Sequence, residues 1–139
     1  MEEVILADTG ALIAYLDESE EHHAWAIERW SAFTTIPVVC EAVLTEVTFL
    51  LWRQHRPMHI PLDMVRCGAI RLDFNLAAES TPVRDLMAHY ANIPMSLADA
   101  CLVRMSEKQE RCRVFTLDSD FRIYRRHRRR SIPLLIPPR

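Results

Sequence analysis

Strands and helices alternate in the pattern of apolar and polar residues along this chain. Five short apolar runs are typical of buried strands; they cover residues 3–8, 35–40, 69–74, 112–118 and 132–136. Between these runs, apolar residues recur three and four positions apart, as on one face of a helix. This spacing predicts helices over residues 9–17, 21–33, 62–68 and 77–90, one that follows residue 40 and ends before the HRPMHIP turn, and one that Ser96 begins. DFRIYRR, at 120–126, is expected to form one or two helical turns.

This alternation predicts an α/β fold. Strands that are separated by helices pair in parallel, and the helices cover both faces of the sheet. We therefore expect a three-layer sandwich whose central parallel sheet has about five short strands. With 139 residues, 50% hydrophobic and 26% charged, the chain suits a single domain over residues 1–139.

Neither the N-terminus nor the cysteines indicate export. MEEVILADTG lacks the basic region and long apolar stretch of a signal peptide, and no apolar run has the length of a membrane span. The four cysteines show no CxxC spacing and three lie in apolar runs, so we expect reduced core residues rather than a zinc site. The sequence thus predicts a cytoplasmic protein with no membrane partner.

Charge is distributed unevenly, although the net charge is only −2. Residues 1–28 hold eight acids and no lysine or arginine, whereas residues 121–139 hold seven arginines and no acid. Arginine binds phosphate oxygens in a bidentate way, so the second segment is a candidate nucleic-acid-binding patch. A solvated surface or a site for an acidic partner protein explains the composition equally well. The candidate residues are Arg122, Arg125, Arg126, Arg128, Arg129 and Arg130.

Glu46 is the single acid in an apolar stretch, AVLTEVTFLLW at residues 42–52. In a helix it shares its face with Val43 and Leu50. An ionised carboxylate removed from water needs a charged partner or a metal, or its pKa rises and it becomes neutral. An arginine such as Arg53 or Arg84 would be a structural partner, whereas a metal would be a functional one.

Three further acids are predicted to lie near Glu46. Asp8 and Asp118 end the strands at 3–8 and 112–118, and Asp99 lies in the first turn of a helix. In an open parallel sheet, ligands bind beyond the carboxyl ends of the strands, so these acids are expected to meet there. Clustered carboxylates repel one another unless a cation lies among them. An all-oxygen site without His or Cys selects Mg²⁺ or Mn²⁺, and such an ion supports phosphodiester hydrolysis.

Each aspartate also has a structural explanation. Asp8 suits the N-cap of the following helix, and an S-x-x-D capping box opens the helix that carries Asp99. Asp118 and Asp120 suit a turn. Neither a cap nor a turn explains Glu46 in mid-helix, and the four acids together favour the metal site.

Four short motifs resemble those of the PIN-domain ribonucleases, especially the VapC-type toxins of bacterial toxin–antitoxin pairs. They are ADTGALIAYLD with Asp8, VLTEVTFLL with Glu46, MSLADACLV with Asp99 and VFTLDSDF with Asp118, in the family's order and approximate spacing over essentially the whole chain. The resemblance implies that these four acids are catalytic and bind Mg²⁺ or Mn²⁺, with Asp120 as a further ligand.

The resemblance also implies an RNA substrate, commonly a homodimer, and an antitoxin protein as a possible partner. Thr9 and Thr116 are expected to orient the neighbouring acids by hydrogen bonds, whereas Ser96 is expected mainly to cap its helix. Two other classes stay open. One is a receiver-type α/β module. Such a module has a lysine at the end of a late strand, whereas Lys108, the single lysine here, is predicted to lie in a helix. The other is a PIN-like protein that binds RNA or a partner without cleaving it.

The remaining aromatic and histidine residues point to ordinary structural roles. The spacing of Trp25, Trp30 and Trp52 with aliphatic residues favours the core or a dimer interface over stacking on bases. His22 and His23, on a surface helix, are expected to be solvated rather than to bind a metal.

Overall fold

Residues 2–138 are described by a computed structural model, in which five strands form one sheet. The sheet order is β3-β2-β1-β4-β7, and every neighbouring pair is parallel. The strands are β1 (Val4–Ala7), β2 (Val38–Val39), β3 (Arg71–Leu72), β4 (Cys112–Phe115) and β7 (Leu134–Leu135). All are shorter than the apolar runs that predicted them, but the expected parallel five-stranded sheet is confirmed.

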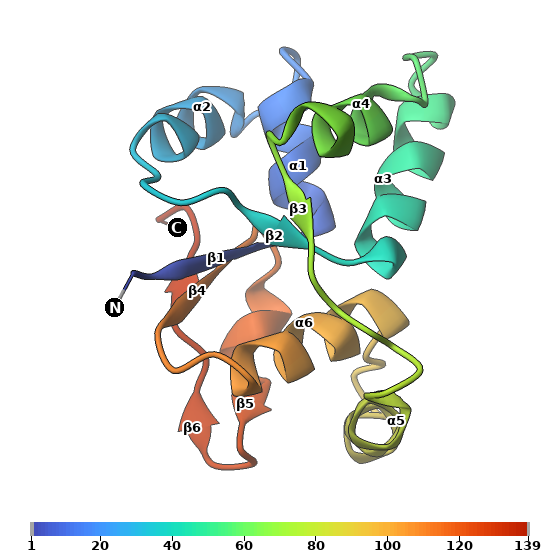
Figure 1. Cartoon of the computed structure of the whole chain (residues 1–139), viewed down its shortest axis with the longest axis vertical. Coiled ribbons are helices and arrows are strands. Elements are labelled where there is room, and N and C mark those ends of the chain that lie inside the picture. The colour runs from blue at the N-terminus through green and yellow to red at the C-terminus, as the bar shows by residue number, and fades with distance from the viewer. Residues whose placement is uncertain (1, 139) are drawn as a thin grey trace.

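The helices form a layer on each side of the sheet (Figure 1). One layer contains α1 (Thr9–Leu16), α2 (His23–Ser31), α3 (Glu41–Arg53) and α4 (Ile60–Cys67). The other contains α5 (Ser80–His89) and α6 (Leu97–Glu107). The predicted three-layer sandwich is therefore confirmed.

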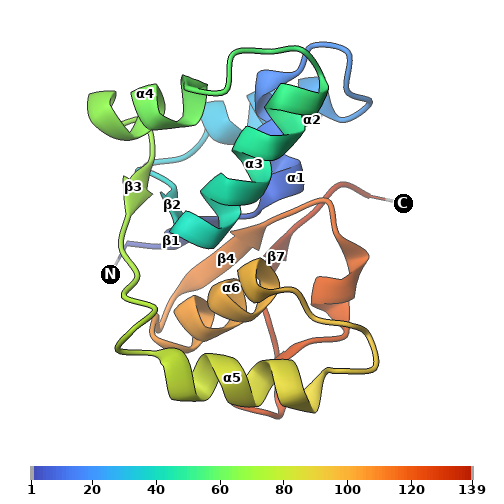
Figure 2. The same cartoon turned by 90° about the vertical axis from the view of Figure 1, so that its right-hand side faces the viewer.

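The two central strands end at the same level. β1 and β4 pair from Val4 with Cys112 to Ala7 with Phe115. The chain leaves β1 through Asp8 into α1, and it leaves β4 toward a 3₁₀ helix, η1 (Ser119–Arg122). Figure 2 looks onto this edge of the sheet, with α3 on one side and α6 on the other. The register thus brings Asp8 beside the segment that follows Phe115.

Aromatic packing fixes one helical layer to the sheet. Phe115 is fully buried, and its ring lies 5.4 Å from Trp25, 5.3 Å from Phe33 and 6.3 Å from Trp30. Trp30 in turn stacks on Tyr15, with ring centroids 4.0 Å apart. Full burial of a ring such as that of Phe115 stabilises the fold by roughly 1.5–3 kcal/mol, and the partly buried rings around it contribute less. Trp25 and Trp30 are core residues, as the sequence predicted.

Trp52 lies outside the core. Its side chain is 59% exposed, and it lies beside the exposed ring of Phe49 on α3, 6.0 Å away. Helical spacing predicted either the core or a dimer interface for the three tryptophans. Trp25 and Trp30 pack against the core, and for the exposed Trp52 the dimer interface stays a prediction.

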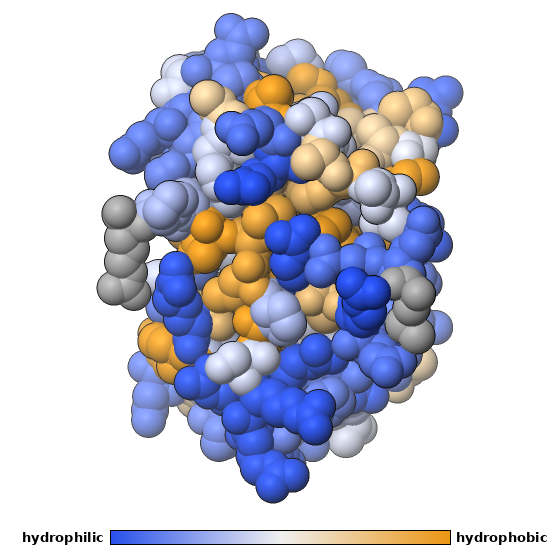
Figure 3. Space-filling view, turned by 90° about the vertical axis from the view of Figure 1, so that its left-hand side faces the viewer, coloured by the Kyte–Doolittle hydropathy of each residue, from blue (hydrophilic) through white to orange (hydrophobic). Residues whose placement is uncertain are grey.

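The prediction of helical turns over residues 120–126 is confirmed by η1 as far as Arg122 and is wrong for the residues that follow. β5 (Arg125–Arg126) and β6 (Arg130–Ser131) form an antiparallel hairpin. His127 (φ 52°) and Arg128 (φ 66°) at its tip adopt left-handed backbone conformations. Turns of this kind usually contain Gly or Asn, so the sequence carried no turn signal. Figure 3 shows the face opposite to that of Figure 2; its lower part, over this hairpin, is strongly hydrophilic.

Candidate metal centre

Asp8 lies at the carboxyl end of β1 and is nearly removed from water, with 5% of its surface exposed. Its Oδ1 accepts a hydrogen bond from the backbone N–H of Thr9 (2.7 Å), which makes it the N-cap of α1. Its Oδ2 accepts a hydrogen bond from the hydroxyl of Thr116 (2.7 Å), which follows β4. The capping role expected of Asp8 is present, and it uses only one of the two carboxylate oxygens.

Asp118 and Asp99 come from the other two segments of the cluster. The N–H of Asp118 donates to the Thr116 hydroxyl (2.9 Å), and its Oδ1 accepts from the N–H of Asp120 (2.9 Å). Asp99 lies in the first turn of α6, where its N–H donates to the Ser96 hydroxyl (3.0 Å). Ser96 is thus the N-cap of α6, and the carboxylate of Asp99 lies in the same cavity as Asp8 and Asp118.

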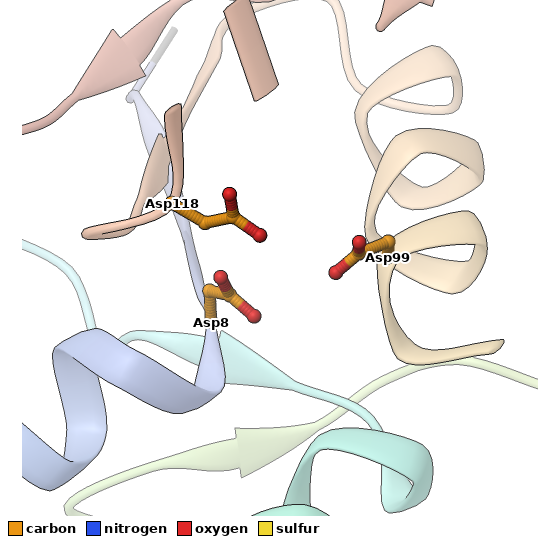
Figure 4. Close-up of side chains that lie close together, drawn as sticks. All are labelled: Asp8, Asp99 and Asp118. Atoms are coloured by element: carbon orange, nitrogen blue, oxygen red, sulfur yellow. The ribbon is translucent and has the colours of Figure 1, made fainter. Parts of the chain in front are cut away.

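The three aspartates converge in space. One carboxylate oxygen from each lies within 4.8 Å of the others, and the side chains point toward one another (Figure 4). They line a solvent-connected cavity of about 500 Å³ to which Glu46 and Asp120 also contribute. The donor atoms here are carboxylate oxygens, the donor set that suits Mg²⁺ or Mn²⁺.

Glu46 lies on the second turn of α3, at the edge of the same cavity. Its Oε1 accepts a hydrogen bond from the Thr9 hydroxyl (2.6 Å). The two arginines considered as structural partners are engaged elsewhere: Arg84 pairs with Asp85, and Arg53 lies over the ring of Phe49. Glu46 is therefore linked to the carboxylate cluster through Thr9 and lies just outside the three-aspartate group.

The cluster carries an electrostatic cost in the metal-free protein. Burial raises the pKa of Asp8 to about 7, despite the hydrogen bonds from Thr116 and Thr9 that lower it; the charges of Asp99 and Asp118 raise it further. Burial also raises the pKa of Asp99, with added repulsion from Asp118 and Glu46. A cation among these carboxylates would remove the repulsion, because opposite charge favours the ionised form.

Tyr124 is a residue of the site that the sequence did not indicate. It is fully buried, and its hydroxyl donates to Oδ2 of Asp99 (2.9 Å). Its ring is held edge-on by Phe121 and Tyr90, each 5.2 Å away. Burial, followed by the carboxylate of Asp99, raises the pKa of Tyr124, so the phenol stays a hydrogen-bond donor. A tyrosine within an arginine-rich stretch has no pattern that marks it as a partner of an acid 25 residues earlier.

A family model identifies the fold. The PIN domain model matches residues 5–126, which is most of the chain. The chain belongs to the PIN domain family. Membership was expected from the four acidic motifs and is confirmed, and it excludes the receiver-type module. Among curated protein sequences, none matches significantly.

A solved structure agrees with this PIN assignment. Mycobacterium tuberculosis VapC20, described as a toxin that cleaves the sarcin–ricin loop, superposes with a TM-score of 0.74 at 19% sequence identity. The match covers 84% of this chain and 91% of VapC20. At this identity the similarity establishes the common fold. None of the helices formed by residues 2–138 has the length and apolar character that crossing a membrane requires.

The candidate arginines of the PIN domain divide into two kinds. Arg122, Arg128, Arg129 and Arg130 are exposed, and Arg125 is half-buried. Arg126 differs, because its guanidinium donates to the carbonyl oxygens of Ser106 and Gln109 at the C-terminal end of α6. These bonds give the half-buried Arg126 a structural role, and its contact with RNA stays a prediction.

Proposed function

We propose that this PIN domain is a metal-dependent endoribonuclease and the toxin component of a toxin–antitoxin pair. The observation that carries the proposal is the three-aspartate cluster, in which Asp8, Asp99 and Asp118 meet within 4.8 Å. Ionised groups this close at the surface of a cavity are typical of a divalent-cation site. The similarity to VapC20, itself described as an RNA-loop-cleaving toxin, supports RNA as the substrate.

Asp8, Asp99 and Asp118 would hold Mg²⁺ or Mn²⁺, with Glu46 and Asp120 as additional acidic ligands from the rim of the cavity. The bound ion would supply an activated water and neutralise charge on the phosphoryl group. The first four of these acids form the proposed catalytic set, and Asp120 is an additional metal ligand.

The surrounding polar groups hold the carboxylates in place. Thr116 links Asp8 to Asp118 through one hydroxyl, which donates to the first side chain and accepts from the backbone of the second. Thr9 orients Glu46, and Tyr124 orients Asp99. Fixed carboxylates lose little conformational entropy when an ion binds, so these donors raise metal affinity.

The RNA strand's phosphates would be bound by the half-buried Arg125 and by the exposed Arg122, Arg128, Arg129 and Arg130. The homodimer and the antitoxin partner are likewise part of the proposal. Sedimentation of the purified chain tests the dimer, and co-purification with the product of the neighbouring reading frame tests the antitoxin. Reduced cysteines and an RNA substrate accord with the expected cytoplasmic location.

Cleavage of RNA by aspartate variants tests the catalytic assignment. Asp99→Asn and Asp8→Asn keep side-chain volume but remove the charge that binds the metal, so each should lower the rate by roughly a thousandfold, the scale of metal-assisted charge stabilisation. Asp63→Asn, which changes an exposed acid on α4, is the matched control and should cleave normally. Wild-type rates for the cavity variants would refute the assignment. RNA binding without metal-dependent cleavage by the wild-type chain would instead favour a non-catalytic PIN protein.

A further inference from the structure

A second cavity lies between α5, α6 and the β5–β6 hairpin. Its volume is about 410 Å³, within the range of small-ligand sites, and it shares no lining residue with the carboxylate cavity. Its lining combines apolar and aromatic surface with positive charge; the residues that matter here are Leu86, His89, Tyr90, Arg125, His127 and Arg128. Such a combination suits a ligand that is both planar and anionic.

The hairpin is held rigidly over this cavity. The two guanidinium hydrogen bonds of Arg126 anchor its base to the C-terminal end of α6, and the N–H of His127 donates to Glu107 (2.7 Å). The N–H of Arg129 closes the turn onto the Arg126 carbonyl (3.3 Å). Left-handed conformations at His127 and Arg128 are unfavourable for residues that carry a Cβ, and such strain persists only where surrounding contacts over-determine it. The position of Arg128 is thus built into the fold.

The positive charge of the cavity is not neutralised by its own acids. Glu107 is occupied by Arg104 (3.4 Å) and by the N–H of His127, and Asp85 is paired with Arg84 (3.1 Å). Among residues 2–138, the guanidinium of Arg125 donates to two neutral oxygens, the Ser131 hydroxyl (3.0 Å) and the Arg122 carbonyl (3.4 Å). Arg125 and the exposed Arg128 are therefore available to an anion.

We infer that this cavity binds one nucleotide of the RNA strand, with its phosphate on Arg125 and Arg128 and its base on Tyr90 and Leu86. The identity of the ligand as RNA rests on the proposed function. Single-stranded RNA is commonly bound by stacking of bases on aromatic side chains beside arginine-bound phosphates. An acidic peptide would satisfy the arginines but would leave the aromatic lining without a planar partner, so the composition of the cavity favours RNA.

The place of this cavity in the fold sets its distance from the cleaved bond. Asp99 lies in the first turn of α6, whereas Arg104 and Glu107, which line the second cavity, lie near its last turn. Asp99 and Glu107 are eight residues apart on α6, which is about 12 Å along the helix axis. The nucleotide in the second cavity is therefore separated from the scissile phosphate along the strand, and it selects the substrate without touching the reacting atoms.

Binding of a fluorescent RNA oligomer in a metal chelator tests this inference without any cleavage. The double variant Arg125→Gln/Arg128→Gln should bind about tenfold more weakly, and its log–log salt dependence should flatten by about 0.7 for each phosphate that it no longer neutralises. His89→Ala should weaken binding less, because it removes only one side of the aromatic lining. Arg66→Gln, an exposed arginine on α4 at the opposite layer, is the matched control and should leave affinity and slope unchanged.

Competition distinguishes the possible ligands. Excess unlabelled RNA should displace the labelled strand, whereas adenosine monophosphate, inorganic phosphate and polyglutamate should not at equal charge concentration. Displacement by polyglutamate would overturn the inference in favour of an acidic protein partner, and equal affinity for the mononucleotide would overturn the role of a strand.

Cleavage assays give a second test of the inference. The double variant should raise KM and keep kcat; loss of kcat alone, or an unchanged salt slope in the binding assay, would also overturn the inference. Inactivity of the wild-type chain would refute the nuclease while leaving the binding result intact.

Discussion

The two ends of α6 carry opposite charges, and the contacts that these charges make differ. At the N-terminal end, Asp99 joins two other carboxylates, and burial and repulsion raise the pKa values of Asp8 and Asp99. At the C-terminal end, Arg126 donates to two carbonyl oxygens. The helix dipole favours both arrangements, because it attracts anions at the start of a helix and cations at its end. The two ends differ in how their charges are balanced: Arg126 has hydrogen-bond partners inside the protein, whereas the aspartates repel one another, and a cation would relieve that repulsion.

The largest expected effect is a dependence of stability on pH at the acidic end of α6. The pKa of Asp8 is about 7 in the folded chain and 3.8 unfolded, so the folded state holds a proton that the unfolded state releases. This stabilisation is complete below about pH 3.8 and is lost as pH rises to about 7. The free energy of unfolding of the metal-free protein should therefore fall between about pH 4 and 7. At neutral pH, Mn²⁺ at a hundredfold excess over its Kd should restore about 2.7 kcal/mol.

Urea unfolding at several pH values, in chelator and in Mn²⁺, measures both effects. Asp8→Asn is the control, because it removes the titrating group and a ligand together; its stability should depend less on pH and respond less to Mn²⁺. Identical pH dependence in the two proteins would show that Asp8 does not cause the effect.

At the basic end of α6, substitution of Arg126 should lower the stability of the fold rather than the affinity for RNA. Arg126→Gln removes charged hydrogen bonds to two carbonyls and should destabilise the fold by about 1.5–2 kcal/mol. The loss is moderated because Nε of Arg126 is buried without a hydrogen-bond partner among residues 2–138. Arg128→Gln, at the exposed tip of the same hairpin, should leave stability unchanged and weaken RNA binding. Melting curves and RNA titrations of both variants separate the two roles, and the reverse outcome would restore Arg126 as an RNA contact.

Tyr124 connects the arginine-rich segment to the acidic end of α6. Loss of its hydroxyl should have a smaller effect, on the affinity for Mn²⁺. Tyr124→Phe keeps the buried ring and removes the hydroxyl that donates to Asp99, so Mn²⁺ affinity should fall about tenfold, the lower limit for groups that orient metal ligands. Calorimetric titration with Mn²⁺ measures this directly. Tyr15→Phe removes the same atom from a ring that stacks on Trp30 and should not change metal affinity. Equal affinities in the three proteins would make Tyr124 a packing residue only.

Substitution of Glu46 should change the free energy of unfolding least, but the sign of that change decides the role of Glu46. Glu46→Gln keeps an oxygen for the Thr9 hydroxyl but removes a charge that repels Asp99, so the metal-free protein should gain up to about 1 kcal/mol. Its stabilisation by Mn²⁺ should be smaller than that of the wild type. Glu41→Gln, in the first turn of the same helix, is the control and should not gain stability. A destabilised Glu46→Gln with a full response to Mn²⁺ would remove Glu46 from the metal site.

Periodicity and strand ends predicted most of what positions the acids. A buried run followed at once by an acid located Asp8, and Ser96 located the start of α6, because caps and strand ends follow local chemistry. The parallel order of the sheet followed from the alternation of strands and helices. These features depend on residues close together in the chain, which is why a sequence reveals them.

The parts that the sequence did not predict depend on distant contacts. The β5–β6 hairpin turns at His127 and Arg128, which have no local preference for left-handed conformations; anchoring by Arg126 to α6 imposes them. The bond from Tyr124 to Asp99 joins residues whose proximity only the folded chain creates. Trp52 has the spacing of a core residue, but it lies on a face of α3 that no element of residues 2–138 covers enough to bury it.

The large sequence separation of Thr116 and Asp8 also affects when the three-aspartate cluster can form during synthesis of the chain. The two residues are 108 residues apart, and β1, made first, has β4 as a central neighbour in the sheet. Until the ribosome has released the chain beyond Asp118, the opening strand lacks that neighbour and Asp8 lacks both its hydroxyl donor and one of its companions. Contacts of such long sequence separation form late, after the entropy of closing a large loop has been overcome. Nascent chains that end before residue 118 therefore cannot assemble the three-aspartate cluster.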